Sequence, residues 1–168
     1  FIIKSDDIQK DPTPSCVYFN RKKSIVVGDK ALTSLQREKI SVFNNDDPSL
    51  LNTFIEFKSN MGTDIKYHSN NMNNDYSSEE LSAEVLKKLK SYVRDEDVDA
   101  IVITVPAKFR GSQKDATTEA AKLAGFDHCI LLQEPIAASM AYGFDAESVD
   151  GVWLVFDFGG GTFVGERR

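Results

Sequence analysis

The 168-residue sequence predicts an α/β protein with a mixed β-sheet and flanking helices around a single core. From Ala100 onwards, short apolar runs alternate with segments of helical periodicity, which is the pattern of strands joined by helices. Before residue 30 the apolar runs are shorter and polar turns separate them, which indicates β-structure. The composition, 41% hydrophobic and 27% charged, is ordinary for a globular fold of this kind.

The first thirty residues indicate short strands joined by polar turns. Apolar residues at 1–3, 17–19 and 25–27 are expected to form three strands, and residues 20–23 supply a hairpin turn between the last two. Gly28 is then expected to open a short helical segment. The beginning of the chain is therefore predicted to be rich in β-structure.

The middle of the sequence indicates two helices. Acidic residues and a proline at 46–48 predict a helix start, and apolar residues at helical spacing extend that helix to about Lys58. A short strand and an asparagine-rich turn are expected between residues 63 and 76. Ser77 and Glu80 have the spacing of a capping box, so a second helix is expected to start there and to cover a sheet with its apolar stripe.

From residue 100 the sequence predicts strand–helix–strand units. Continuous apolar runs at 101–105 and 129–132 are expected to be buried strands. Between them, Ser112 with Asp115 is expected to cap a helix that ends at Gly125. Ligands collect at strand ends in open sheets of this type, so polar residues at those ends become candidates for a site.

A glycine-rich stretch follows the final apolar run. Glu134 first begins a helix rich in small residues, and residues 152–156 then predict a buried strand. That strand leads into Asp157, three glycines at 159–161 and Thr162. Consecutive glycines let backbone N–H groups approach an anion, and an aspartate at a strand end can hold a hydrated cation. A tight hairpin turn explains the same residues equally well.

Composition excludes several classes of protein. The formal net charge of −6 argues against a nucleic-acid-binding protein, and no apolar run approaches the roughly 18 residues of a membrane helix. Cys16 and Cys129 lack metal-ligand spacing, so buried free thiols in a reducing, cytoplasmic location are expected. The Gly-x-Gly-x-x-Gly dinucleotide motif before a helix, the Gly-x-x-x-x-Gly-Lys-Ser/Thr phosphate loop and a Ser-His-Asp arrangement are absent from the sequence.

Several short motifs occur in a particular order and at particular spacings along the chain. Together they indicate a protein family more specifically than any one of them does. They resemble the nucleotide-binding domain of the seventy-kilodalton heat-shock chaperones, within the actin-like ATPase superfamily, whose lobes have a ribonuclease H-like fold. The segments that carry this resemblance are Thr13-Pro14-Ser15, residues 25–28, Phe57-Lys58-Ser59-Asn60-Met61-Gly62, Val105-Pro106-Ala107-Lys108-Phe109, residues 112–117, Ala124-Gly125-Phe126, Glu134-Pro135-Ile136-Ala137-Ala138 with residues 139–143, and residues 156–163.

The resemblance implies a site for ATP or ADP with Mg²⁺. By position, Lys58 matches the lysine that reaches the γ-phosphate and the attacking water. Glu134 matches the glutamate near Mg²⁺ and that water, and Asp157 matches the acid that holds the Mg²⁺ shell through water. The second phosphate loop of the family is matched by Gly159, Gly160, Gly161 and Thr162. Without that resemblance, the favoured interpretation of Lys58 is a lysine that interacts with the dipole at the end of a helix.

The resemblance also implies what lies beyond these 168 residues. The family's first phosphate loop and second lobe are not in this sequence, so residues 1–168 are interpreted as an incomplete first lobe. After Phe163 the family's aspartate is replaced by Val164, and a charged tail is expected in place of an apolar strand. The isolated chain is therefore expected to bind ATP weakly and to be inactive, and its open face, including residues 136–142, is expected to self-associate.

The intact protein is expected to hydrolyse ATP to control the binding of unfolded polypeptides, with a J-domain cochaperone and a nucleotide-exchange factor as partners. Neither nucleic acid nor a membrane is expected as a partner. The alternatives are a filament-forming actin homologue or a sugar kinase in the same superfamily, and a non-hydrolysing interaction module or pseudo-ATPase. Retention of Lys58, Glu134 and Asp157 argues against degeneration, whereas loss of the aspartate after Phe163 argues for it.

Overall fold

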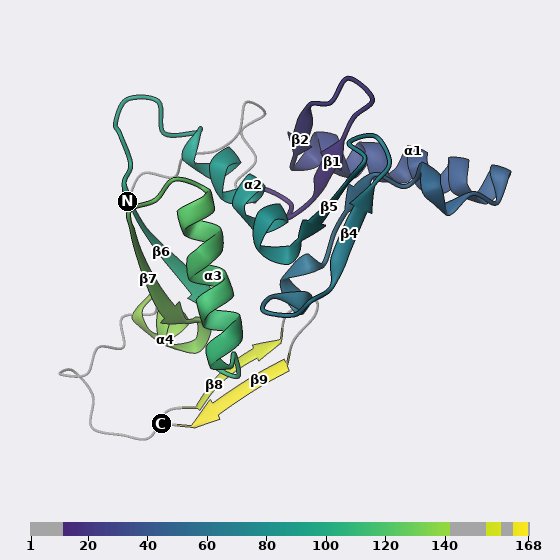
Figure 1. Cartoon of the computed structure of the whole chain (residues 1–168). Coiled ribbons are helices and arrows are strands. Elements are labelled where there is room, and N and C mark those ends of the chain that lie inside the picture. The colour runs from purple at the N-terminus through teal and green to yellow at the C-terminus, as the bar shows by residue number, and fades with distance from the viewer. Residues whose placement is uncertain (1–11, 142–153, 159–162, 168) are drawn as a thin grey trace.

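The computed structural model describes residues 12–141, 154–158 and 163–167 of the chain (Figure 1). Its first sheet has the order β2-β1-β3 and is antiparallel throughout, with β1 at Val17–Phe19, β2 at Ile25–Val27 and β3 at Thr53–Phe54. Asn20 closes the β1–β2 hairpin, because its Oδ1 accepts hydrogen bonds from the N–H groups of Lys22 and Ser24 at 2.9 and 3.0 Å. This hairpin was expected; the strand expected at 1–3 lies outside the described residues.

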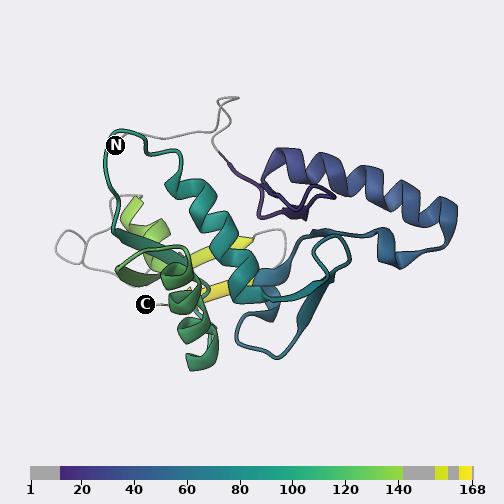
Figure 2. The ribbon, with the colours of Figure 1, turned by 45° about the horizontal axis from the view of Figure 1, so that its top comes forward.

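Two expectations for the next segment were wrong. The helix opened by Gly28 is not short: α1 spans Asp29–Asn45 and extends away from α3 and α4 (Figure 2). The helix expected from 46 to about 58 does not form. Two 3₁₀ turns, η1 at Pro48–Leu50 and η2 at Phe57–Asn60, flank β3 instead. Strand pairing explains the difference, because Thr53 and Phe54 pair with β1 and tertiary pairing overrides the local helical periodicity.

A second hairpin precedes the helix that was predicted from its cap. β4 at Lys66–Ser69 pairs with β5 at Asn74–Ser77, a strand that the sequence did not indicate, and the asparagine-rich segment turns between them. The helix α2 spans Ser78–Lys90. Its capping box is confirmed, since Ser77 Oγ accepts from the Glu80 N–H at 3.2 Å and the Glu80 carboxylate accepts from the Ser77 N–H at 2.7 Å.

One hydrophobic cluster joins the first sheet to α2. Phe19 is fully buried in it and stacks on Tyr76, with ring centroids 4.2 Å apart. Leu81 enters the cluster from α2, and Leu89 of the same predicted stripe is 40% exposed. The buried members are Val17, Phe19, Phe54, Phe57, Leu81 and Val85.

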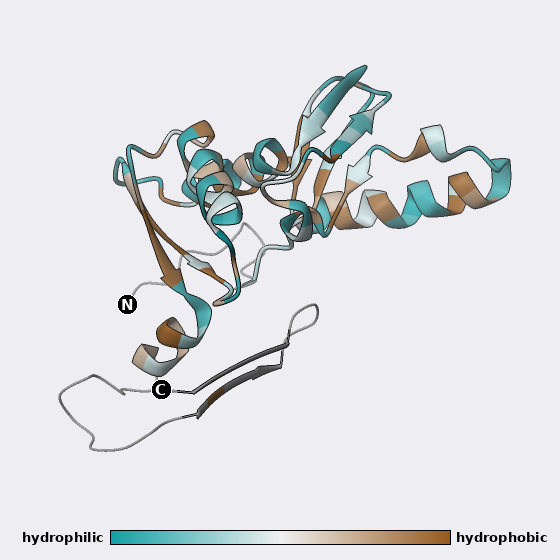
Figure 3. Cartoon of the chain, turned by 60° about the horizontal axis from the view of Figure 1, so that its bottom comes forward, coloured by the Kyte–Doolittle hydropathy of each residue, from teal (hydrophilic) through white to brown (hydrophobic). Residues whose placement is uncertain are grey.

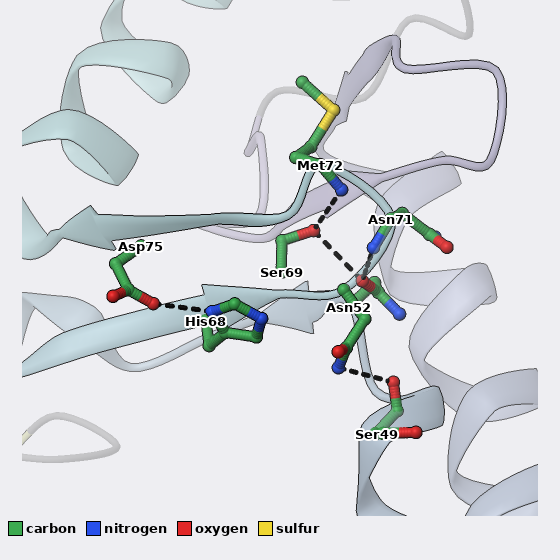
Figure 4. Close-up of polar contacts among 8 residues, drawn as sticks. Ser49, Asn52, His68, Ser69, Asn71, Met72 and Asp75 are labelled. Atoms are coloured by element: carbon green, nitrogen blue, oxygen red, sulfur yellow. Dashed lines mark hydrogen bonds and ion pairs between the residues drawn. The ribbon is translucent and has the colours of Figure 1, made fainter.

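The buried side chain of Asn52 connects three segments of this half (Figure 4). Its Oδ1 accepts hydrogen bonds from Ser69 Oγ at 3.0 Å and from the Asn71 N–H at 2.8 Å. The backbone N–H of Asn52 donates to the Glu38 carboxylate of α1 at 2.9 Å, and Asn71 Nδ2 donates to the Phe19 carbonyl at 2.7 Å. The asparagine-rich turn is therefore fixed to α1, β1 and β3.

The second half begins with a parallel strand–helix–strand unit. β6 at Ala100–Val105 and β7 at His128–Gln133 pair in parallel, and α3 at Gly111–Leu123 connects them. The cap expected at Ser112 is wrong: Arg110 is the N-cap, and its N–H donates to the Gln113 side chain at 3.0 Å. The stop at Gly125 is confirmed, since Gly125 has a φ of 82° and its N–H donates to the Lys122 carbonyl.

These two strands are buried on one face only, which corrects the expectation of fully buried strands. The inner face packs against α3 through Ala121, Ala124 and Phe126. On the outer face, Val102 and Ile130 lie opposite each other in the register and are 59% and 64% exposed. Figure 3 shows hydrophobic residues along this part of the chain.

The chain ends with a helix and a hairpin. α4 spans Glu134–Ala141, as expected for its start, and contacts both β7 and β8. β8 at Leu154–Phe158 pairs antiparallel with β9 at Phe163–Arg167, so residues 163–167 form a strand and not merely a charged tail. Among the described residues, no helix combines the length and hydrophobicity needed to cross a bilayer.

Both cysteines are free thiols, but they differ in burial. Cys16 is buried, and burial followed by the nearby Glu38 carboxylate raises its pKa to about 11. Cys129 is only half-buried, contrary to expectation, although it packs against the cluster of Ala121, Ala124 and Phe126; this partial burial still raises its pKa. A raised pKa disfavours the thiolate, which is the nucleophilic form of a cysteine side chain.

Candidate functional site

Lys58 and Glu134 form a direct ion pair although 76 residues separate them in the sequence. Lys58 Nζ donates to Glu134 Oε1 at 2.7 Å, joining η2 in the first half to the start of α4 in the second. The lysine side chain is 57% exposed and the glutamate side chain 20%, so the ammonium group faces solvent from a half-buried partner. Two of the residues singled out from sequence thus meet at one surface.

The turn that carries Lys58 is held by its apolar neighbours. Phe57 is 2% exposed and belongs to the cluster beneath α2, whereas Met61 is 3% exposed and packs with Ala116 and Ala120 of α3. Lys58 lies between these two anchors, in a short turn with little freedom to shift along the surface. Lys58 itself is not part of the core. Its charged group is exposed to solvent on a turn that Phe57 and Met61 hold in place.

Backbone geometry adds to this support. Glu56, just before the turn, has a φ of 58°, in the left-handed region that a non-glycine residue seldom occupies. Its carbonyl accepts hydrogen bonds from both the N–H and the hydroxyl of Ser59, at 3.2 and 2.7 Å. Strained backbone of this kind persists only where its surroundings over-determine it, and it clusters at functional sites.

Glu134 stands at the carboxyl end of a parallel strand. β7 ends at Gln133, and Glu134 is the first residue of α4, followed by the buried Pro135. Carboxyl ends of strands and the first turns of helices that follow them are places where ligands gather in α/β proteins. An acidic residue in the first helical turn is also stabilised by the helix dipole.

For Asp157, the structure describes the position of the backbone. It lies near the end of β8, where it pairs with Val164 of β9, and α4 packs against β8. The helix that begins with Glu134 and the strand that carries Asp157 are therefore neighbours. Gly159, Gly160, Gly161 and Thr162 lie outside the described residues, and the choice between a plain hairpin turn and a phosphate loop is not tested.

The donor set suits a hydrated Mg²⁺ ion. Within the described ranges there is no group of three or more histidine, cysteine, aspartate or glutamate side chains that could hold a metal. Mg²⁺ is normally held by one or two carboxylates together with water and substrate phosphates, so it requires no dedicated cage. Glu134 and Asp157 are carboxylates of the required kind on neighbouring elements.

Comparison with known proteins shows the family. The family described as Hsp70 protein matches residues 2–164. The chain belongs to the Hsp70 family. It is 39% identical over 154 residues to the Chaperone protein DnaK of Thermosipho melanesiensis and 40% identical over 154 residues to that of Methanothermobacter thermautotrophicus. These alignments cover 90% and 89% of this chain, and 24% and 23% of the relatives.

A third relative gives the same result. The Chaperone protein DnaK of Mycoplasmopsis agalactiae is 40% identical over 157 residues, which cover 92% of this chain and 24% of the relative. The Hsp70 chain thus spans about a quarter of the length of the curated relatives it matches. The mixed α/β architecture described above is consistent with a part of the Hsp70 actin-like ATPase domain.

One part of the site's support was not indicated by the sequence. In this Hsp70 chain, the Gly62 N–H donates to Glu79 Oε1 at 2.9 Å, so the end of the Lys58 turn is attached to the first turn of α2. In the sequence, Glu79 is one of two adjacent acids at a helix start, and that position explains an acidic residue without any further contact. The link crosses 17 residues and depends on how β4 and β5 fold back.

Proposed function

We propose that residues 1–168 form the first lobe of an ATP-binding and ATP-hydrolysing domain in a molecular chaperone. ATP or ADP with Mg²⁺ would be bound by Lys58 and Glu134 together with Asp157, Gly159, Gly160, Gly161 and Thr162. The observation that carries the proposal is the 2.7 Å contact of Lys58 Nζ with Glu134 Oε1, in a chain of the Hsp70 family.

The chemistry of phosphoryl transfer fits this set of residues. Catalysis of that reaction depends mainly on positioning and on neutralising charge, with little covalent chemistry for the protein to perform. Lys58 supplies an exposed cation for phosphate oxygens on a rigid turn, and Glu134 orients that cation while it is available as an acceptor for water. Mg²⁺, when bound, supplies further neutralisation of the phosphates.

The Hsp70 family favours a chaperone over the other members of the superfamily. A filament-forming actin homologue and a sugar kinase have no support from the relatives, which are described as chaperone proteins. For the intact protein we propose nucleotide-controlled binding of unfolded polypeptides, assisted by a J-domain cochaperone and a nucleotide-exchange factor. A cytoplasmic location is proposed with it, and cell fractionation tests that location.

A chimaera tests whether the chain acts as a first lobe. The 168 residues would replace the matching segment of the DnaK protein of Thermosipho melanesiensis, and ATP hydrolysis would be measured at steady state. We expect hydrolysis by the chimaera, and a fall of kcat by roughly a hundredfold or more in Lys58→Met, because a positioned charge at the transferred phosphate is lost. A matched control, Lys39→Met, removes an exposed lysine from α1 and is expected to leave kcat unchanged.

Hydrolysis by the Lys58→Met chimaera at the rate of the parent would contradict the role of Lys58. A folded chimaera that fails to hydrolyse ATP would contradict the role of the whole chain and favour a non-hydrolysing module. The fold is checked separately by circular dichroism, so a folding failure is not mistaken for a catalytic one.

The isolated chain provides a second test. We expect weak binding of Mg-ATP and no measurable turnover, because in this proposal the 168 residues supply one lobe of a two-lobed site. Isothermal titration of the chain with Mg-ATP measures this directly. Micromolar binding by the chain alone would contradict the prediction and would mean that one lobe suffices to hold the nucleotide.

A further inference from the structure

We propose that Glu79 is a positioning residue for Lys58, because it fixes the end of the turn that presents the lysine to Glu134. The consequence for nucleotide chemistry rests on the proposed function, whereas the link between Glu79 and the Lys58 turn stands independently of it. Glu79 acts through Gly62, and the ion pair itself is made by Lys58 and Glu134.

The contact between Glu79 and Gly62 joins two elements that support the site. The Gly62 N–H donates to Glu79 Oε1 at 2.9 Å, directly after the 3₁₀ turn that carries Lys58. Gly62 has a φ of 70°, and a Cβ atom at this position would lie 2.6 Å from the Ser112 carbonyl oxygen. The end of the turn is therefore held between the first turn of α2 and the first turn of α3.

Glu79 is held in place by the geometry of its own helix. It is the second residue of α2, and the capping box of Ser77 and Glu80 fixes the helix start on either side of it. The backbone from which the Glu79 side chain reaches Gly62 is therefore fixed by the cap. A hydrogen bond to a charged acceptor is stronger than a neutral one.

The surroundings favour the ionised carboxylate. Partial burial of Glu79 alone would raise its pKa, but the hydrogen bonds from the N–H groups of Gly62 and Glu79 itself, the Ser77 side chain and the charge of Lys66 together lower the pKa from its ordinary value. Glu79 also lines a shallow groove between α2 and α3 with Asp115, Glu119 and Lys122 of α3. The carboxylate is thus charged at neutral pH with acids of the neighbouring helix facing the same groove.

The link reaches Lys58 through a short, well-packed segment. Met61 is 3% exposed, its N–H donates to the Lys58 carbonyl, and it packs against α3. If Gly62 loses its acceptor, the 61–63 segment loses its link to α2, while Phe57 and Met61 remain packed. The end of the turn is then less firmly held, and Lys58 Nζ is directed less closely toward Glu134.

Nuclear magnetic resonance of the 168-residue chain without nucleotide tests this link. Glu79→Gln removes the charge with little change in shape, and Glu79→Asp keeps a charge in the first turn but shortens the side chain. The matched control is Glu119→Gln, which neutralises an acid of the same groove whose carboxylate lies 3.8 Å from Lys122 Nζ on its own helix. The measurements are the Gly62 amide proton shift against pH, amide exchange at Met61 and Thr63, and the Lys58–Glu134 side-chain NOE.

In the parent chain and in Glu119→Gln, the Gly62 amide shift is expected to titrate with the lowered pKa of Glu79, and the NOE is expected to be present. In Glu79→Gln and Glu79→Asp we expect the titration to be lost or moved. Exchange at Met61 and Thr63 is expected to rise by about tenfold, the size of one charged hydrogen bond. The Lys58–Glu134 NOE is expected to weaken, which a purely local role of Glu79 would not cause.

Unchanged exchange and an unchanged NOE in folded Glu79→Gln and Glu79→Asp would overturn the proposal. If Glu79→Gln fails to fold, Glu79→Asp decides, since it retains the favourable acid at the helix start. ATP is not needed in any of these measurements. Failure of the chimaera to hydrolyse ATP would therefore contradict the proposed function and leave this result as it stands.

Discussion

Gly62 shows how closely single residues are packed around the candidate site. The position combines a left-handed φ of 70° with a distance of only 2.6 Å between the place a Cβ atom would take and the Ser112 carbonyl oxygen. Only glycine adopts that backbone at little cost, and no flexible side chain can move aside, because the neighbouring atoms belong to the backbone. Any larger residue must push the Lys58 turn away from α3.

We expect Gly62→Ala to lower the free energy of unfolding by about 2–4 kcal/mol, from left-handed strain and the steric clash together. Urea denaturation measures the change. The matched control is Gly111→Ala, at the first position of α3, where an added Cβ meets nothing within 4 Å. That substitution is expected to be neutral or to stabilise by up to about 1 kcal/mol. Equal effects of the two substitutions would contradict the packing argument.

Single residues also show what the sequence can indicate about the site. The identity of Lys58 and Glu134 as candidates came from motif resemblance, and their 2.7 Å contact was not predicted. A pair separated by 76 residues has no local signal, since its geometry depends on how η2 and α4 are brought together. For Glu79, the sequence indicates only an acidic residue at a helix start, which is common, and does not indicate its contact with Gly62.

At the scale of elements, the capping signals at Ser77 and Gly125 held, the N-cap expected at Ser112 lies at Arg110 instead, and the local signals failed where strand pairing decides. The capping box at Ser77 and the glycine stop at Gly125 are properties of a few neighbouring residues, and both formed as predicted. The helix expected from 46 to about 58 failed because Thr53 and Phe54 pair with β1, which the periodicity of the segment does not encode. The strand β5 was missed for the same reason, since it exists only through its pairing with β4.

Ser77→Ala is expected to destabilise the chain by about 1 kcal/mol, because the Glu80 N–H loses its acceptor at the start of α2. Ser41→Ala on α1 is the matched control. Ser41 is exposed and its hydroxyl bonds back to the Arg37 carbonyl of its own helix, so alanine is expected to be neutral there. Thermal unfolding compares the two variants, and a Ser77→Ala protein as stable as Ser41→Ala would contradict the role of the cap.

At the scale of the whole molecule, apolar side chains are exposed on several faces. The parallel pair β6–β7 has α3 on one face, while Val102 and Ile130 on the other are 59% and 64% exposed. On α1, Phe43 is 87% exposed, and on α4, Met140 is 62% exposed. The sequence predicted strands buried on both faces, which parallel strands usually are.

Exposed apolar area of this kind predicts self-association at high concentration. Sedimentation velocity at low and high concentration measures it. We expect the combined change Val102→Thr and Ile130→Thr to weaken association, because it makes the outer face of β6–β7 more polar while keeping β-branched residues in the strands. A clean monomer at high concentration would contradict the prediction. Association unchanged in the double variant would assign it to α1 or α4 instead.

The Lys58–Glu134 pair has a consequence for the order in which the protein is made. A ribosome adds about 5–20 residues per second, so Lys58 leaves the exit tunnel roughly 4–15 s before Glu134. During that interval Phe57 can pack against α2 first, and Met61 can pack against α3 once residues 111–123 have emerged. The turn that carries Lys58 is therefore fixed at Phe57 before it is fixed at Met61. The two charges meet only after the second strand of the parallel pair has been synthesised.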